Sequence, residues 1–218
     1  MPGRALIEKR PWLLASLAAA ISFYFVKDSG LPGLYQMAWK GAGVALLAVY
    51  AVQRHGGKDG RTIALVMAFG ALGDVLIELS LYAGAIAFLF GHVTAISLYL
   101  RHRREALTPS QKAAVVVLLI ATPIISFMLP ADRAGAPGIA VYALSLGGMA
   151  AAAWSSSFPR YRVGLGAVMF VASDLLIFAR LGPLESSTLP GLLIWPLYYF
   201  GQFLICTGVV SSLRNRDV

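Results

Sequence analysis

Residues 82–100 read YAGAIAFLFGHVTAISLYL, nineteen positions without an aspartate, glutamate, lysine or arginine. A helix needs about 20 consecutive apolar residues to cross the hydrocarbon core of a bilayer, so this stretch predicts a transmembrane helix. Apolar runs of similar length recur on both sides of it, although the first is short. We expect eight helices in all, at residues 11–26, 34–52, 61–80, 82–100, 112–130, 136–154, 162–179 and 189–212.

The composition supports the same interpretation. Of the 218 residues, 58% are hydrophobic and 13% are charged, which is too little charge to cover a water-soluble domain of this size. The single cysteine, Cys206, lies in an apolar run and excludes an intrachain disulfide. We therefore predict an all-α, polytopic bundle that forms one transmembrane domain over residues 1–218, with halves at 1–105 and 106–218 if the chain is an internal repeat.

Lysine and arginine are distributed unevenly between the two ends of the expected helices. Fourteen of the 18 fall on one side, Lys27, Arg133 and Arg180 fall on the other, and Lys40 lies inside a span. Because basic loops stay in the cytoplasm, we expect an integral, multi-pass membrane protein with both termini cytoplasmic. These loops also account for the net charge of +8, so no nucleic-acid partner is implied.

The first apolar run follows Arg4, Lys9 and Arg10, an arrangement that also occurs in secretory signal peptides. We interpret residues 11–26 as a retained first helix, since cleavage would leave seven spans and reverse the charge asymmetry. The expected number of spans is therefore eight.

Two short stretches of related sequence each carry an aspartate inside an expected helix. Residues 71–77 read ALGDVLI and residues 171–177 read VASDLLI, offset by 100 positions. If the match reflects an internal repeat, two parallel four-helix halves place Asp74 and Asp174 at the same depth, in the outer half of the bilayer. We expect these two carboxyls to meet in a nearly dry pocket and to carry the function.

Five ionisable side chains fall within the expected spans: Lys40, Asp74, Glu78, His92 and Asp174. Each costs about 2.5 to 3.5 kcal/mol at bilayer depth, so each should face the protein interior and have a function or a partner there. The alternatives are that Lys40 snorkels to the interface, that Glu78 is solvated at the outer surface, and that His92 bonds a neighbouring helix. The two aspartates have fewer such structural explanations.

The last helix adds polar side chains in its outer half. Tyr198 and Gln202 are four residues apart and share a face, Tyr199 lies beside them, and Pro196 should kink the helix. Polar groups at this depth bond a neighbouring helix or a ligand, whereas tyrosines also occur in the aromatic belt of the interface. We include all three polar residues among the candidates for substrate binding.

Of two common hydrolase sites, one is excluded and the other is weakly supported. His55 and His102 fall in loops, so a three-histidine zinc site cannot form around His92, although one histidine with carboxylates could still hold a metal. No G-x-S-x-G motif is present, and Ser173 is better explained as a small packing residue. The residues therefore imply no cofactor, and we assign no metal ligand.

The order of these motifs resembles that of the YhhN family of membrane proteins, whose characterised animal members are lysoplasmalogenases. The residues that carry the resemblance are Lys40, Gly73-Asp74, Phe88 to His92, Ser173-Asp174 and Tyr199-x-x-Gln202. The resemblance implies hydrolysis of the vinyl-ether bond of a lysoplasmalogen, a lysophospholipid of the bilayer, to a fatty aldehyde and glycerophosphoethanolamine or glycerophosphocholine. Glu78 matches no position of the family pattern.

The residues suit this implied reaction. Vinyl-ether hydrolysis begins with protonation of the outer alkene carbon and passes through an oxocarbenium ion that water captures, so it requires a neutral acid beside an anion. Two buried carboxyls supply both, as they do in glycosidases. We assign Asp74 and Asp174 as this pair without choosing the acid, and give supporting roles to His92 at the water and Lys40 at the lipid phosphate.

Two other functions stay open. A transporter also combines parallel repeats with charges at depth, but carriers have broken helices at matching positions, whereas Pro123 and Pro196 fall on the fifth and eighth expected helices. A lipid-binding protein with a buried carboxylate site is the third candidate. No oligomeric state is indicated by the sequence.

Overall fold

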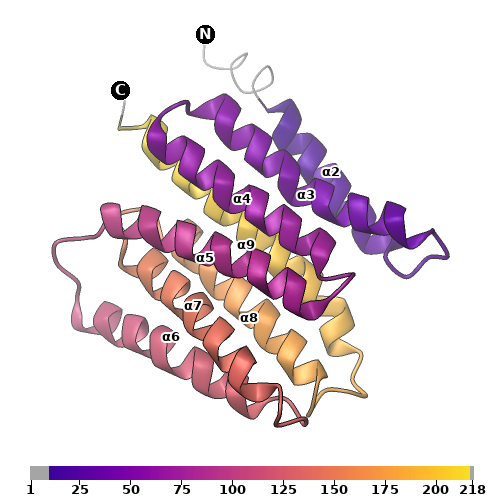
Figure 1. The fold of residues 1–218 in the computed structure, drawn as a ribbon. Helices are drawn as coiled ribbons and strands as arrows, with labels where there is room; N and C mark the ends of the chain where they lie inside the picture. Colours follow the sequence, from indigo (N-terminus) through magenta and orange to yellow (C-terminus); the bar gives the residue numbers. More distant parts are fainter. Residues whose placement is uncertain (1–9, 217–218) are drawn as a thin grey trace. The chain divides into compact units, whose positions relative to one another are not determined.

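The computed structural model describes residues 10–216, which consist of helices, turns and loops (Figure 1). Within this range the eight α-helices are α2 (Pro11–Val26), α3 (Gly33–Arg54), α4 (Lys58–Leu76), α5 (Leu81–Arg101), α6 (Pro109–Met128), α7 (Ala136–Ser155), α8 (Leu165–Arg180) and α9 (Leu189–Arg214). One π-helical turn, η1 (Arg160–Gly164), precedes α8. The all-α prediction is confirmed, and an α-helix is present at each of the eight expected apolar runs. Arg4 and Lys9, which suggested a signal peptide, lie outside the described residues.

Five of these helical segments are long and apolar enough to cross a membrane: α5, α6, α7, η1 with α8, and α9. Helix α2 is apolar but has only 16 residues, as expected for the first helix. Helices α3 and α4 are more polar, because Lys40 lies within α3 and Lys58, Asp59 and Arg61 begin α4. Five apolar helices of this length identify a multi-pass membrane protein.

The surface of α6 agrees with a lipid environment. Its two buried residues, Thr122 and Ser126, are polar, whereas the exposed side chains are mostly large and apolar. Those exposed side chains are Val116, Val117, Leu119, Ile120, Ile124, Ile125, Phe127 and Met128. Water would drive so much exposed apolar surface to associate, whereas lipid tails solvate it.

Helix α4 ends at Leu76, four residues before the predicted boundary at residue 80. The backbone N–H of Ser80 donates to the Leu76 carbonyl, and α5 begins at the next residue. Gly84 in α5 makes this tight reversal possible, since a Cβ there would lie 2.6 Å from Ile77 Cβ. Glu78 therefore lies in the turn after α4, and its predicted position on the helix was wrong.

The described residues form two compact units. Unit 1 takes the chain up to Thr94 together with the residues from Val209 onward, and unit 2 takes Ala95–Gly208. In unit 1, α3 packs against both α2 and α4. Ser16 Oγ donates to the Gly43 carbonyl at 2.5 Å, so small and hydroxyl side chains hold α2 against α3 as they do in other membrane helix pairs.

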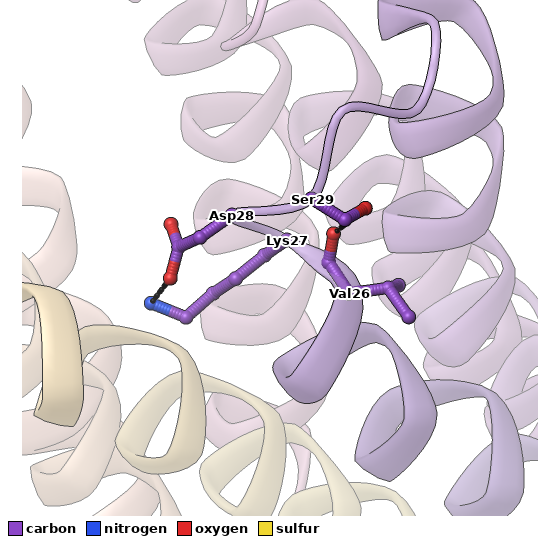
Figure 2. Close-up of polar contacts among 4 residues, drawn as sticks. All are labelled: Val26, Lys27, Asp28 and Ser29. Atoms are coloured by element: carbon purple, nitrogen blue, oxygen red, sulfur yellow. Dashed lines mark hydrogen bonds and ion pairs between the residues drawn. The ribbon is translucent and has the colours of Figure 1, made fainter.

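The connection between α2 and α3 in unit 1 carries a local ion pair (Figure 2). Lys27 Nζ lies 3.3 Å from the neighbouring Asp28 carboxylate, and Ser29 Oγ donates to the Val26 carbonyl at 2.6 Å. The Asp28 side chain is 86% exposed, so water solvates the pair and it contributes little to stability.

In unit 2, α7 packs against α6 and α8. The loop after α5 is fastened to the end of α7 by Arg104, whose Nε donates to the Ser156 carbonyl at 2.6 Å and whose Nη2 donates to the Phe158 carbonyl at 3.2 Å. Carbonyls at and beyond a helix C-terminus lack intrahelical donors, and a cation there is favoured by the helix dipole. Arg104 therefore caps the C-terminus of α7.

Helices α8 and α9 approach to backbone contact within unit 2. A Cβ at Gly201 would lie 2.7 Å from the Gly166 carbonyl oxygen, and a Cβ at Gly166 would lie 2.6 Å from the Gly201 carbonyl oxygen. Small residues at such crossings are typical of membrane helix pairs. The two glycines therefore set the separation of α8 and α9.

The variant Gly201→Ala should destabilise the protein by about 1 to 3 kcal/mol, because the added methyl group meets backbone that cannot move aside. The matched control is Gly191→Ala, also in α9, where a Cβ would meet nothing within 4 Å. Alanine favours a helix over glycine, so this control should keep or slightly raise the melting temperature. Thermal unfolding in detergent measures both, and equal melting temperatures for the two variants would contradict the backbone contact.

Candidate functional site

Asp74 lies in the last turn of α4 and only 2% of its surface is exposed. The preceding residue, Gly73, lies against the ring of Phe88 in α5, since a Cβ at Gly73 would be 2.7 Å from Phe88 Cζ. Any larger residue would displace this ring. Gly73 thus allows α4 and α5 to approach each other beside the buried carboxyl.

His92 lies one turn after Phe88 in α5. Residues four apart share a helix face, and both of these side chains are buried. His92 is therefore on the face of α5 that Phe88 packs against α4. Unit 1 holds Asp74 and His92 on two helices that contact each other, as expected for an interior rather than a lipid-facing histidine.

Lys40 in α3 forms an ion pair with Glu78 in the turn after α4, with Lys40 Nζ 2.5 Å from Glu78 Oε1. The Lys40 side chain is 18% exposed and that of Glu78 is 45% exposed. The lysine is thus the more enclosed partner, and the pairing accounts for a cation inside an apolar helix. Sequence reasoning named both residues but not their contact.

Asp174 lies in α8 of unit 2 and is buried. Tyr142, a buried residue of α7, donates its hydroxyl to Asp174 Oδ2 at 2.6 Å. Sequence reasoning did not select Tyr142. The available signal was its position within the apolar segment 136–154, because a buried tyrosine hydroxyl usually has a hydrogen-bond partner.

Ser173, next to Asp174, is fully buried and faces α9. Its Oγ donates to the Ile194 carbonyl at 3.0 Å. This hydrogen bond between helices agrees with the interpretation of Ser173 as a packing residue. It also fixes the rotation of α8 that carries Asp174.

Tyr198, Tyr199 and Gln202 of α9 are all buried. The Tyr198 ring meets Phe170 of α8 edge-on at 5.1 Å, and the Tyr199 ring stacks on Trp195 at 6.0 Å. Their burial contradicts the alternative that the tyrosines form an aromatic belt at the lipid interface. Helix α9 continues through Pro196 from Leu189 to Arg214.

The structure distributes the predicted residues between the two units. Unit 1 contains Lys40, Asp74, Glu78 and His92, and unit 2 contains Asp174, Tyr198, Tyr199 and Gln202 together with Tyr142. Within residues 10–216, no three histidine, cysteine, aspartate or glutamate side chains are arranged so that they could hold a metal ion.

These features define a class of protein: a multi-pass helical membrane protein with a buried aspartate in each of two compact units. The chain belongs to the YhhN family, which it matches over residues 35–209. This match confirms the resemblance in motif order, and it includes every candidate residue named above.

Two curated relatives are similar to most of the chain. Proteins named lysoplasmalogenase from Mycobacterium bovis and Mycobacterium tuberculosis are each 30% identical over 195 residues, covering 84% of this chain and 74% of the relative. No solved structure matches the chain significantly.

Proposed function

We propose that this protein hydrolyses the vinyl-ether bond of lysoplasmalogens to a fatty aldehyde and a glycerophosphoethanolamine or glycerophosphocholine. The observation that carries the proposal is a buried carboxyl in each unit, Asp74 and Asp174, within a chain whose relatives are named lysoplasmalogenase. Burying a carboxyl in an apolar helix costs desolvation, so two such residues favour a chemical role over a structural one.

The reaction requires one carboxyl as an acid and one as an anion. The acid transfers its proton to the outer alkene carbon, which leaves an oxocarbenium ion at the carbon bonded to oxygen. The anion stabilises this cation, and water adds to it and gives up a proton to a carboxylate. The resulting hemiacetal then breaks its bond to the glycerol oxygen, which takes a proton, and the aldehyde is released.

The contact between Tyr142 and Asp174 supports a division of these roles. A phenol that donates to Asp174 Oδ2 stabilises an anionic carboxylate through a charge-assisted hydrogen bond. We therefore assign Asp174 as the anion and Asp74 as the acid. Tyr142 acts as a positioning residue for Asp174.

The other candidates have supporting roles in the proposal. Lys40 binds the lipid phosphate, since an ammonium group is a strong donor to phosphate oxygens. His92 orients the attacking water, and the three polar residues of α9 bind the glycerol oxygens. The alkyl tail lies between helices, where lipid-facing walls provide an apolar slot.

We also propose that all eight helices cross the bilayer, with both termini in the cytoplasm. The 22 residues of α3 and the 19 of α4 each extend about 30 Å, the thickness of the hydrocarbon core. The asymmetry of basic residues supports the orientation. An odd number of spans would place the termini on opposite sides.

Fusions can test this topology in bacteria. A C-terminal green fluorescent protein should fluoresce and a C-terminal alkaline phosphatase should be inactive, because the first matures in the cytoplasm and the second outside it. Phosphatase inserted between α6 and α7, after Asp132, should be active. The opposite pattern at either position would contradict the proposed orientation.

The test of the function is aldehyde release by purified protein in detergent from a synthetic lysoplasmalogen. A matched lysophospholipid with a saturated ether in place of the vinyl ether should give no product, because it has no alkene to protonate. Absence of aldehyde from the vinyl ether, together with flux of intact lipid or solute across sealed liposomes, would favour the transporter instead.

A further inference from the structure

The ion pair of Lys40 and Glu78 lies close to one of the proposed catalytic carboxyls. Glu78 follows Asp74 by four residues, in a turn that is hydrogen-bonded to the last turn of α4, since the Ile77 N–H donates to the Gly73 carbonyl and the Ser80 N–H donates to the Leu76 carbonyl. Both residues of the pair belong to unit 1, as Asp74 does. A ligand held by the pair would thus present its next few atoms to Asp74.

The ion pair of Lys40 and Glu78 contributes little to the stability of the fold. Solvent screens an ion pair when one partner is as exposed as Glu78, and enclosing Lys40 in an apolar helix costs desolvation that the pair only offsets. The exposure is also one-sided, with Lys40 enclosed and Glu78 open at 45%. A charged ligand can therefore reach the pair from the side of the glutamate.

The two charges complement a zwitterionic phospholipid headgroup. In such a headgroup an anionic phosphate and a cationic nitrogen are separated by two carbons. Lys40 can exchange its bond to Glu78 for bonds to phosphate, while Glu78 exchanges Lys40 for the headgroup cation. Neither side chain is left unpaired before or after the exchange, which removes the main cost of opening a partly enclosed ion pair.

Glutamate distinguishes between headgroup cations. A primary ammonium has three N–H donors and can form charge-assisted hydrogen bonds to Glu78, whereas a trimethylammonium has none and is typically bound by aromatic faces. A headgroup without a cation places its phosphate beside the Glu78 carboxylate and is repelled. The pair therefore favours ethanolamine over choline, and both over phosphate alone.

The geometry points to Lys40 and Glu78 as the headgroup subsite of the enzyme, with Glu78 selecting ethanolamine lysoplasmalogens through their primary ammonium. This inference rests on the proposed lysoplasmalogenase function. A three-carbon glycerol separates the phosphate from the vinyl ether, and four residues that begin in the last turn of α4 separate Asp74 from Glu78.

The experiment compares Glu78→Gln with the wild-type protein on three synthetic vinyl-ether lysolipids that share one chain and differ in headgroup: ethanolamine, choline, and phosphate alone. We expect kcat/KM for the ethanolamine lipid to fall about tenfold through KM, the value of one charge-assisted hydrogen bond. The kcat/KM for the choline lipid should fall less, and the kcat/KM for the phosphate lipid should stay the same or rise. The matched control, Asp28→Asn, removes a second carboxylate of unit 1 that is paired with a lysine, and it should leave kcat/KM unchanged for all three lipids (Figure 2).

An equal loss on all three lipids, or no loss on any, would overturn the inference while leaving the proposed function intact. If Glu78→Gln lowers the melting temperature, the headgroup preference of the wild-type protein still tests the inference. Equal kcat/KM of the wild-type protein for the ethanolamine and phosphate lipids would also overturn the inference. Absence of aldehyde from all three lipids with the wild-type protein would instead refute the proposed function, and the inference with it.

Discussion

Replacing Asp74 or Asp174 by asparagine should reduce kcat for aldehyde release by about 10²- to 10⁴-fold, the contribution typical of a positioned acid or base. Asparagine keeps the size of the side chain and its capacity for hydrogen bonds but can neither transfer a proton nor carry a negative charge. KM should change little, because neither carboxyl is assigned to the headgroup or the alkyl tail. The measurement is aldehyde release from a vinyl-ether lysolipid over a range of concentrations.

The double variant separates a catalytic pair from two independent effects. If the two carboxyls act as a unit, the double variant Asp74→Asn with Asp174→Asn should have a kcat no lower than that of the less active single variant. Asp132→Asn, an exposed aspartate in the loop between α6 and α7, is the matched control and should keep full activity. Full activity of both single variants, with unchanged melting temperatures, would exclude the two-carboxyl mechanism.

Replacing Tyr142 by phenylalanine should lower kcat by about 10- to 100-fold, since hydrogen bonds to charged groups contribute about 1.5 to 3 kcal/mol. The hydroxyl that Tyr142 donates to Asp174 Oδ2 is lost, while the ring and its edge contact with Phe178 are kept. Because the tyrosine acts through Asp174, the same change in an Asp174→Asn background should cost little more. Steady-state kinetics of the four proteins in this cycle give the coupling directly.

The matched control for this change is Tyr99→Phe. Tyr99 is as deeply buried, but its hydroxyl has no hydrogen-bond partner among the residues that the structure describes. Removing that hydroxyl should leave kcat unchanged and should not lower the melting temperature. If Tyr142→Phe behaves like Tyr99→Phe, the hydrogen bond to Asp174 has no catalytic role.

The helices were predictable from the sequence because apolar runs of the right length have few other uses. The end of α4 was not, since the alternation of Ile77 and Leu79 with Glu78 and Ser80 gives no stop signal such as a proline or glycine. What stops the helix there is the approach of Gly84 to Ile77, a contact between two helices that hydropathy does not encode. The same reasoning applies to η1, whose π-helical turn gives no signal in the apolar pattern.

The candidate residues were predictable where the sequence itself indicates a free-energy cost of burying a charged group. Asp74 and Asp174 stood out because a carboxyl in an apolar run needs a reason to be there. Tyr142 did not, because a tyrosine in such a run can equally face lipid. The contact of Lys40 with Glu78 joins positions 38 residues apart, and only the packing of α3 against α4 brings them together.

The crossing of α8 and α9 has a consequence for how a lipid enters. Gly166 and Gly201 touch through main-chain atoms, which have no rotamers to exchange and no side chain to swing aside. The two helices consequently cannot move apart through side-chain rearrangements alone. Asp174 and Tyr198 therefore lie on a rigid pair of helices. Any opening that admits an alkyl tail must therefore involve helices other than this pair.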